Sequence, residues 1–336
     1  MDLNWDLLLP KNLLTFFSNI ILKKSFVHAY FFIGPAGTNK QKTALYFVQS
    51  IFCQHNEDFT DDIPCLKCDN CKQVSKSIHP DLIQIKQLEN NANITIEQIR
   101  YLNQRLSMKP LLAKYQVVII YNVELMTDEA ANALLKNLEE PAPETIFILI
   151  ANNILTVPKT IISRCQVVRF TSINKQELFN YYVKKNKETN EIDKYFRFSQ
   201  GLPGLLDNYL QIDDFWLEEI EEVKQKLLKH KLPLSDKFDF IKKILLNKNL
   251  VNEKKQILQN EIEIWIKIFR DILLIKLNLK NLIRFQELLI PLEKFAKYYS
   301  TKDALKILDQ LLILNNKINY NLNSQLVLEN LYLNII

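Results

Sequence analysis

Glycine is scarce in this sequence, with only four among the 336 residues. The four form two close pairs, Gly34 with Gly37 and Gly201 with Gly204. Glycine accepts a positive φ and lets other atoms approach the backbone closely. A chain that uses so few glycines and still keeps two pairs predicts turns or close backbone approaches at both places.

Long hydrophobic runs and the marks of a secretory signal are also missing. No apolar run approaches the 18 residues that indicate a membrane-spanning helix. The opening residues MDLNWDLLLPK have neither a basic start nor a small-residue cleavage site. We therefore expect a cytoplasmic protein that does not enter a membrane. A large charge excess is absent too, because 43 basic and 38 acidic residues give a net charge of +5. This balance permits contact with nucleic acid without requiring it.

The length of 336 residues suits two or three domains, and the 48% hydrophobic content can fill sizeable cores. In the centre of the chain, the apolar runs 117–120 and 146–150 flank a helical segment over 127–140, capped by Thr127 or Asp128. Short β-branched runs of this kind are typical of strands buried on both faces of a parallel sheet. The sequence therefore predicts an α/β fold with a parallel sheet in its first half.

Helical patterns dominate the rest of the chain. An amphipathic helix is expected at the start, over 5–24. After the sheet, short helices are expected over 175–184 and 191–199. From Asp213 onward the chain is predicted to be all helical and to form a bundle, with helices that include 257–276, 289–298, 302–317 and 324–333.

A degenerate phosphate-binding loop follows the first predicted strand, 28–33. An intact loop of this class reads G-x-x-x-x-G-K-[ST] between a strand and a helix. Gly34 and Lys40 match, but Asn39 replaces the second glycine and Gln41 replaces the hydroxyl that binds Mg²⁺. Asparagine tolerates the left-handed conformation, so the loop can keep its shape. We expect Gly34, Gly37 and Lys40 to form a loop that binds nucleotide weakly or not at all.

The acids of a nucleotide-hydrolysing site are absent as well. In such sites the strand that opens the central unit ends in carboxylates that hold Mg²⁺ and orient water. Here that strand ends in Tyr121 and Asn122. The unit retains an arginine, Arg164, within Ser163-Arg164-Cys165, at an expected domain edge. The planar fork of an edge arginine suits phosphate oxygens in a partner's site. The alternative is a surface arginine in a structural ion pair.

The cysteines predict a metal site. Cys65, Cys68 and Cys71 follow one another at three-residue steps, and Cys53 stands upstream. Four thiolates so arranged are a pattern for Zn²⁺, and the expected cytoplasmic location disfavours the alternative of disulfides. Four sulfur ligands close the coordination shell, so the zinc would be structural. The distant Cys165 is expected to be a buried thiol.

Several stretches of the sequence resemble the clamp-loader branch of the AAA+ ATPases. EAANALLKNLEEP followed by SRC is a highly specific combination, and the matching stretches together span most of the chain. They are HAYFFIGPAGTNK, the four clustered cysteines, HPDL at 79–82, EAANALLKNLEEPAPET at 129–145, TIISRCQVVRF at 160–170, GLPG at 201–204 and WIKIFRDILLIK at 265–276.

The resemblance implies three domains. These are a RecA-like domain over 1–170 with a zinc-binding insertion at 53–71, a helical lid over 171–208 and a helical collar for oligomerisation over 209–336. It also implies a heteropentamer with ATP-hydrolysing gamma or tau subunits and a delta subunit. Within the bacterial DNA polymerase III holoenzyme, that assembly opens the sliding clamp and places it on primed DNA.

In that family, Ser-Arg-Cys carries an arginine that reaches into a neighbour's ATP site, which corresponds to Arg164 beside Ser163. The chain departs from the ATPase members at Tyr121 and Asn122, where they have acids. It also has Gly204 roughly where they have a lid arginine. These departures favour a non-hydrolysing subunit that serves as a stator and donates an arginine.

Two other hypotheses remain to be compared. An active clamp-loader ATPase of the gamma or tau type is disfavoured by four losses in one site, at positions 39, 41, 121 and 122. A zinc-dependent nucleic-acid-binding module is disfavoured by the acidity of the cysteine segment, which matches phosphate poorly. Its acids are Asp58, Asp61, Asp62 and Asp69.

Overall fold

The computed structural model describes residues 5, 7–55, 63–88, 93–184, 192–206, 215–229, 233, 236, 251–317 and 323–334. The chain divides into two compact units, Met1–Asp207 and Asn208–Ile336. The expected boundary between residues 208 and 209 lies outside the described residues. The expected division of the first unit at residue 170 stays a prediction.

The first unit is built on a five-stranded, all-parallel sheet with the strand order β2-β3-β4-β1-β5. Every residue of β1, β3 and β4 is buried, as expected for strands covered on both faces. The predicted α/β fold is confirmed. The strands are β1 (Ala29–Ile33), β2 (Leu82–Ile85), β3 (Gln116–Ile120), β4 (Thr145–Ala151) and β5 (Gln166–Arg169).

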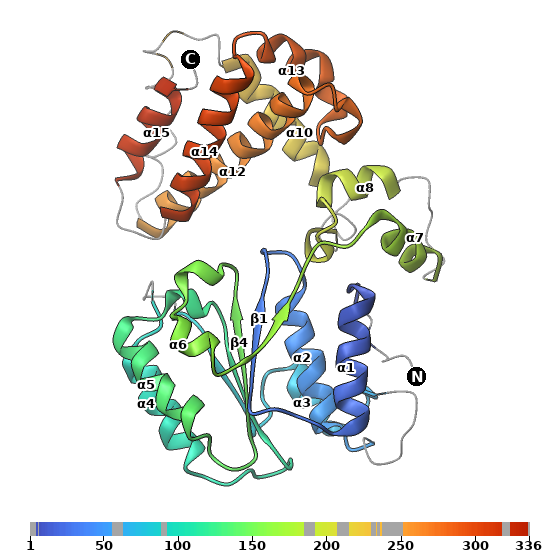
Figure 1. The fold of residues 1–336 in the computed structure, drawn as a ribbon, viewed down its shortest axis with the longest axis vertical. Helices are drawn as coiled ribbons and strands as arrows, with labels where there is room; N and C mark the ends of the chain where they lie inside the picture. The colour runs from blue at the N-terminus through green and yellow to red at the C-terminus, as the bar shows by residue number, and fades with distance from the viewer. Residues whose placement is uncertain are drawn as a thin grey trace. The chain divides into compact units, whose positions relative to one another are not determined.

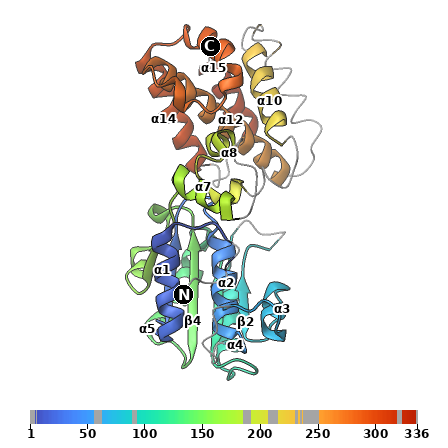
Figure 2. The same cartoon turned by 90° about the vertical axis from the view of Figure 1, so that its right-hand side faces the viewer.

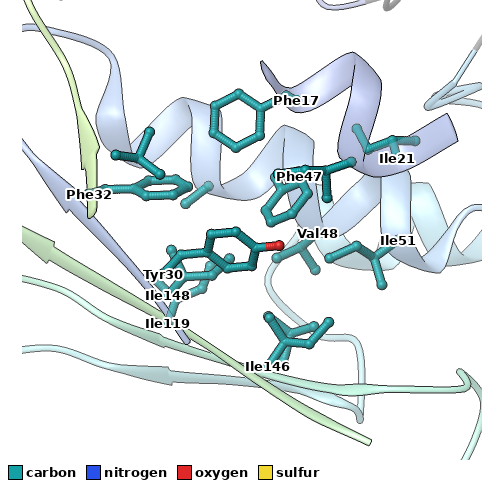
Figure 3. Close-up of a cluster of buried hydrophobic side chains, with 14 of the residues drawn as sticks. Phe17, Ile21, Tyr30, Phe32, Phe47, Val48, Ile51, Ile119, Ile146 and Ile148 are labelled. Atoms are coloured by element: carbon teal, nitrogen blue, oxygen red, sulfur yellow. The ribbon is translucent and has the colours of Figure 1, made fainter. Parts of the chain in front are cut away.

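Helices cover both faces of this sheet (Figures 1 and 2). One face carries α1 (Lys11–Lys23), α2 (Lys40–Phe52) and α3 (Asp69–Ser75), and the other carries α4 (Ile96–Leu106), α5 (Asp128–Glu139) and α6 (Lys159–Ile162). Successive strand residues alternate between the two layers. Tyr30 and Phe32 pack with Phe17 and Phe47 on the first face (Figure 3), whereas Phe31 packs on the second.

Local signals set several helix ends. The Thr127 hydroxyl accepts a hydrogen bond from the Ala130 N–H at 3.2 Å and caps α5. The expected helix over 5–24 begins later than predicted, at Lys11, because Pro10 occupies its N-cap. Inside a helix, a proline lacks the N–H donor and collides with the preceding turn. Trp5 instead lies in the lead-in segment, buried, with its indole N–H donating to the Ser50 hydroxyl at 3.2 Å.

The last elements of the first unit are helical. They are α7 (Lys175–Lys184), α8 (Ile192–Ser199) and a helical turn at 203–206. Gly201 between them has a φ of +72°, and a side chain there would lie 2.3 Å from the Ile173 carbonyl oxygen. Only glycine fits this position without strain.

The second unit is helical, as predicted. Helix α12 packs against α13, α14 and α15, and the rings of Trp265, Phe269 and Phe295 meet in its core. None of the helices that the structure describes is both long and apolar enough to cross a membrane. The helices are α10 (Phe215–Lys229), α12 (Val251–Lys276), α13 (Leu289–Ala296), α14 (Thr301–Lys317) and α15 (Ser324–Asn334), with 3₁₀ turns η3 (Lys280–Leu282) and η4 (Gln286–Leu288).

A charged cluster ties α10 to α12 and to the segment before η4. The largely buried Glu219 carboxylate accepts hydrogen bonds from Arg284 at 2.9 and 3.1 Å and from Lys267 at 2.7 Å. Burial raises the pKa of Glu219, but the charges of Arg284 and Lys267 outweigh it, so the pKa lies below its ordinary value of 4.5. Glu219 is therefore charged at neutral pH and contributes stability in that form.

Glu219→Gln should destabilise the second unit at pH 7 by about 3 kcal/mol, because it removes the largely buried negative charge that pairs with both Arg284 and Lys267. A depressed carboxyl pKa gives stability that is complete above the unfolded-state pKa and is lost as the pH falls through the folded-state pKa. The difference from the natural chain should thus hold from pH 7 to about 5 and shrink below the ordinary value of 4.5. Urea unfolding across this pH range tests it. The exposed neighbour variant Glu218→Gln is the control and should change little; equal effects of the two would contradict the prediction.

Candidate functional site

The degenerate phosphate loop lies at the carboxyl end of β1, between β4 and β5 in the sheet. The strand order reverses direction beside β1, and ligands of open α/β sheets bind at such points. Gly34 begins the loop. A side chain on Gly34 would lie 2.2 Å from the Phe170 carbonyl oxygen, so this glycine lets the segment after β5 pass close to the loop. The loop thus occupies the expected ligand position.

Lys40, the first residue of α2, points back into its own loop. Its ammonium donates to the Gly34 and Pro35 carbonyl oxygens, both at 2.6 Å, and to the Thr38 hydroxyl at 3.3 Å. Burial lowers the pKa of Lys40 to about 8, against the opposing charge of Glu124. The cation that would hold a phosphate is therefore already bonded to oxygens of the loop.

The two glycine pairs meet at this loop. The Gly204 N–H donates to the Gly37 carbonyl oxygen at 2.6 Å. A side chain on Gly204 would lie 3.0 Å from that oxygen and 3.1 Å from the Asn39 amide oxygen. Gly37 has a φ of +80°, and Asn39 takes the left-handed conformation at φ 63°. The predictions of special backbone at the glycines and of a left-handed Asn39 are both confirmed, and segment 201–206 lies directly on the loop.

Tyr121 and Asn122 follow β3, where hydrolytic acids would stand. The Tyr121 hydroxyl donates to the Gln84 amide oxygen at 3.0 Å, and burial raises the pKa of Tyr121 to about 12. At neutral pH it remains a neutral phenol and supplies no anionic ligand for Mg²⁺. Sequence reasoning missed Glu124, in the 3₁₀ turn η1 (Val123–Leu125). Its carboxylate accepts from the Asn152 N–H at 3.0 Å and acts electrostatically on Lys40.

Arg164 lies just after α6, with about a third of its side chain exposed. Its Nη1 donates to the Thr160 carbonyl oxygen at 2.8 Å, and its Nη2 pairs with the Glu139 carboxylate. Ser163, the C-cap of α6, donates from its hydroxyl to the same Thr160 oxygen at 3.1 Å. In this chain Arg164 thus makes an ion pair, and its functional role stays a prediction.

The connection between β4 and Arg164 contains the 3₁₀ turn η2 (Ile154–Thr156) as well as α6. Ile161 of α6 is buried and joins the sheet core, which fixes the segment. Cys165 is mostly buried and donates from its thiol to the Ile161 carbonyl oxygen at 3.3 Å. Burial raises the pKa of Cys165 to about 12, as expected for an inert thiol.

The structure brings Cys53, Cys65, Cys68 and Cys71 together, with all four Sγ atoms within 4.8 Å of one another. Backbone N–H groups donate to the sulfurs in sequence: Cys65 to Cys53 at 3.5 Å, Cys68 to Cys65 at 3.3 Å and Cys71 to Cys68 at 3.4 Å. Such bonds stabilise negative thiolates. The donor set, its spacing and these bonds fit a tetrahedral metal ion held by four sulfurs.

Helices α2 and α3 support this cluster. The Asn70 amide donates to the Phe52 carbonyl oxygen at 2.8 Å, and the Gln49 amide donates to the Cys71 carbonyl oxygen at 3.0 Å. Sequence reasoning missed His55, whose pKa is raised by hydrogen bonds to Cys65 and then to Cys53. The position of His55, two residues after Cys53, is the sequence signal that could have placed it near the cluster.

HPDL, at 79–82, has a structural role. Asp81 is almost fully buried, and its two carboxylate oxygens accept the backbone N–H groups of Leu111, Leu112 and Ala113 at 2.7 to 2.8 Å. His79 stacks on the Phe52 ring with the ring centroids 4.5 Å apart. These contacts fix the segment before β3 to the segment before β2.

Comparison with known families decides the relationship. Residues 9–174 match the family model described as DNA polymerase III, delta subunit. Over 94% of the chain, the sequence is 26% identical to DNA polymerase III subunit delta′ of Bacillus subtilis, and the match covers 92% of that protein. The chain is a clamp-loader subunit of the DNA polymerase III family.

Other members of the clamp-loader family are also similar to this chain. It is 38% identical to DNA polymerase III subunit tau of Bacillus subtilis over 160 residues, which are 48% of this chain and only 27% of tau. Among solved structures, the chain aligns with a gamma subunit-related protein of Thermotoga maritima at 17% identity and a TM-score of 0.45, covering 94% of this chain and 97% of that one.

In this clamp-loader subunit, the predicted site residues fall into three separate places. The first is the phosphate loop with Gly34, Gly37 and Lys40; the second is the edge after α6 with Ser163 and Arg164. The third is the cysteine cluster between α2 and α3. The residues of each set lie close together in the structure. The roles of the three sets are proposals.

Proposed function

We propose that this chain is a delta-prime-like subunit that hydrolyses no ATP, acts as a stator and donates Arg164 to a neighbouring subunit's ATP site. The observation that carries the proposal is the closed phosphate loop. The Lys40 ammonium bonds to two loop carbonyl oxygens at 2.6 Å, and the Gly204 N–H bonds to a third. The near-complete alignment with the Bacillus delta′ subunit supports the same role.

Hydrolysis needs two things that this site does not offer. A triphosphate must reach the lysine and the backbone N–H groups of the loop, and Mg²⁺ and water must be held by acids. Here segment 201–206 covers the loop, and the neutral Tyr121 stands at an acid position. Glu124 is a single carboxylate, bonded through one oxygen to the Asn152 N–H, so it does not restore the missing pair of acids.

Arg164 is proposed to act in trans as an arginine finger. A guanidinium that enters a partner's site can bind two phosphate oxygens at once and stabilise the charge that develops as the γ-phosphate is cleaved. Ser163 caps α6 and sets the point at which Arg164 leaves the helix. The partial exposure of Arg164 supports this role, because a fully buried arginine would not reach another subunit.

The assembly proposed for this chain is the clamp-loader heteropentamer with gamma or tau subunits and a delta subunit. It would load the sliding clamp onto primed DNA in the cytoplasm during replication. The helical unit of this chain would serve as the collar through which subunits associate. The cysteine cluster would hold one structural Zn²⁺, since its four sulfurs leave no position open for chemistry.

An active ATPase of the gamma or tau type is the second candidate. The 38% identity with the Bacillus tau subunit and the proximity of Glu124 to Lys40 favour it. It is less well supported, because the loop is closed and the Mg²⁺ hydroxyl and both acids are replaced.

A zinc-dependent nucleic-acid module was disfavoured by the acidity of the cysteine segment. Asp58, Asp61 and Asp62 lie outside the described residues, so this acidity remains an argument from sequence.

The isolated chain should show no ATP turnover above background and should bind ATP weakly or not at all. Phosphate release and calorimetric titration with MgATP measure the two quantities. Lys40→Ala is the matched variant and should leave both results unchanged. Turnover that survives purification and disappears in Lys40→Ala would mean that the phosphate loop is catalytic and the stator proposal is wrong.

A further inference from the structure

Arg164 uses both ends of its guanidinium fork, one of them in the ion pair with Glu139. Nη1 is bonded to the Thr160 carbonyl oxygen and Nη2 to the Glu139 carboxylate. A guanidinium has five N–H donors, so these two bonds leave others for a phosphate. They nevertheless hold the guanidinium at this place, so Glu139 competes with any phosphate that has to draw Arg164 away from it.

The position of Glu139 gives the pair a specific cause. Glu139 is the last residue of α5, and the exposed Glu140 follows it. The carboxyl end of a helix carries partial negative charge, which disfavours acids and favours cations there. The last turn of α5 has one cation of its own, Lys136, and Arg164 brings a second cation to this helix end. The guanidinium is thus attracted by both the carboxylate and the helix end.

The strength of this attraction is limited. Glu139 is about half exposed and Arg164 about a third exposed, so water and salt screen the pair. Exposed pairs of this kind shift an equilibrium by about two- to fivefold. Such a pair can hold the arginine in one place and still release it to a phosphate, which carries more negative charge than a carboxylate.

We infer that Glu139 is a positioning residue that holds Arg164 at the domain edge and competes with the partner's phosphate for its guanidinium. This inference rests on the proposed function of Arg164 and adds a restraint to it. ATP hydrolysis in the neighbouring subunit is held back until the assembly closes on clamp and primed DNA. Closure brings the phosphate close enough to displace Glu139 from Arg164. Lys136 remains beside Glu139 after the exchange.

The test uses the clamp loader reconstituted from its full set of subunits, with ATPase rates measured in the absence and presence of clamp and primed DNA. Glu139→Gln keeps the shape and removes the charge. It should raise the basal rate about two- to fivefold at the one site that Arg164 serves, and by less for the whole assembly. The stimulated kcat should stay unchanged, so the stimulation ratio falls. Glu140→Gln removes the same charge from the same helix end and should leave both rates unaltered. A purely structural ion pair would not change the ratio.

Arg164→Ala and the double variant Glu139→Gln/Arg164→Ala complete the cycle. The double variant should match Arg164→Ala, because Glu139 acts only through Arg164. Suppose that Arg164→Ala lowers the stimulated rate. If Glu139→Gln then either behaves like Glu140→Gln or lowers the basal rate, the inference about Glu139 is wrong and the proposed role of Arg164 stands. If Arg164→Ala itself changes neither rate, the proposed role of Arg164 is wrong.

Discussion

Arg164→Ala should abolish ATP hydrolysis at the one site that faces this subunit, with a loss on the order of 10³–10⁵ in rate at that site. The reason is that alanine leaves the charge on the cleaved γ-phosphate without its bidentate partner. In the proposed assembly the other sites would keep their own arginines, so the steady-state rate of the whole assembly should fall much less. The phosphate burst in the first turnover should therefore lose the amplitude of one site, and clamp loading should slow sharply.

Two controls separate this effect from damage to the fold. The ion pair of Arg164 with Glu139 is exposed, so the free energy of unfolding should change by less than about 1 kcal/mol and assembly should remain intact. Arg169→Ala removes an exposed arginine from the nearby edge strand β5 and should preserve the burst. Arg164→Lys should rescue poorly, because an ammonium lacks the fork. If the Arg164→Ala variant keeps the full burst and loads clamps normally, the role of Arg164 is limited to its structural ion pair.

Loss of the metal should have the second-largest effect. Protein purified without oxygen should contain about one zinc ion per chain, and Cys71→Ser should reduce this to near zero, since Cys71 is fully buried within the cluster. Structural zinc contributes on the order of 10 kcal/mol or more to the folding of small domains built around it. Here the sheet has its own core, so the loss should loosen segment 53–71 and leave the sheet folded.

Elemental analysis and hydrogen exchange measure these two consequences. Cys165→Ser is the control, because Cys165 lies outside the cluster, and it should keep the full metal content. Exchange should increase in α3 after Cys71→Ser and remain slow in β3 and β4, which are buried throughout. Protein that contains no metal after anaerobic purification would show that the four thiols have another purpose.

Local features of the sequence were sufficient to predict much of the fold. Helix α7 begins and ends where predicted, and β3 and β4 begin and end within one residue of the predicted runs, because β-branched runs, caps and prolines act within a few residues. The Thr127 cap and the left-handed Asn39 are of the same kind, since each depends on the chemistry of one residue and its neighbours. The four cysteines could be grouped from their spacing, although the long gap after Cys53 gave no geometric reason for it to join the others.

Contacts between distant segments could not be predicted from the sequence. Nothing in GPAGTN or GLPG indicates that the Gly204 N–H would reach the Gly37 carbonyl oxygen, because that contact depends on how the segment after α8 returns over the sheet. The partner of Arg164 was foreseen only as an unnamed ion pair, and Glu139 is one of several acids near the end of α5. Glu124 lies beyond the two positions after β3 where acids are expected, and nothing in the sequence links it to Lys40.

The closed phosphate loop has a consequence for thermodynamic linkage. A ligand shifts a conformational equilibrium only by the difference between its affinities for the two states. In this loop the Lys40 ammonium and the Gly204 N–H are already bonded to loop carbonyl oxygens. If ATP does not bind there, as proposed, it has no such difference to act on. The segment 201–206 would then keep one position at every ATP concentration, while neighbours with open loops alternate between two. If the chain works in a ring as proposed, it would set the fixed coordinate against which the movements of the other subunits are defined.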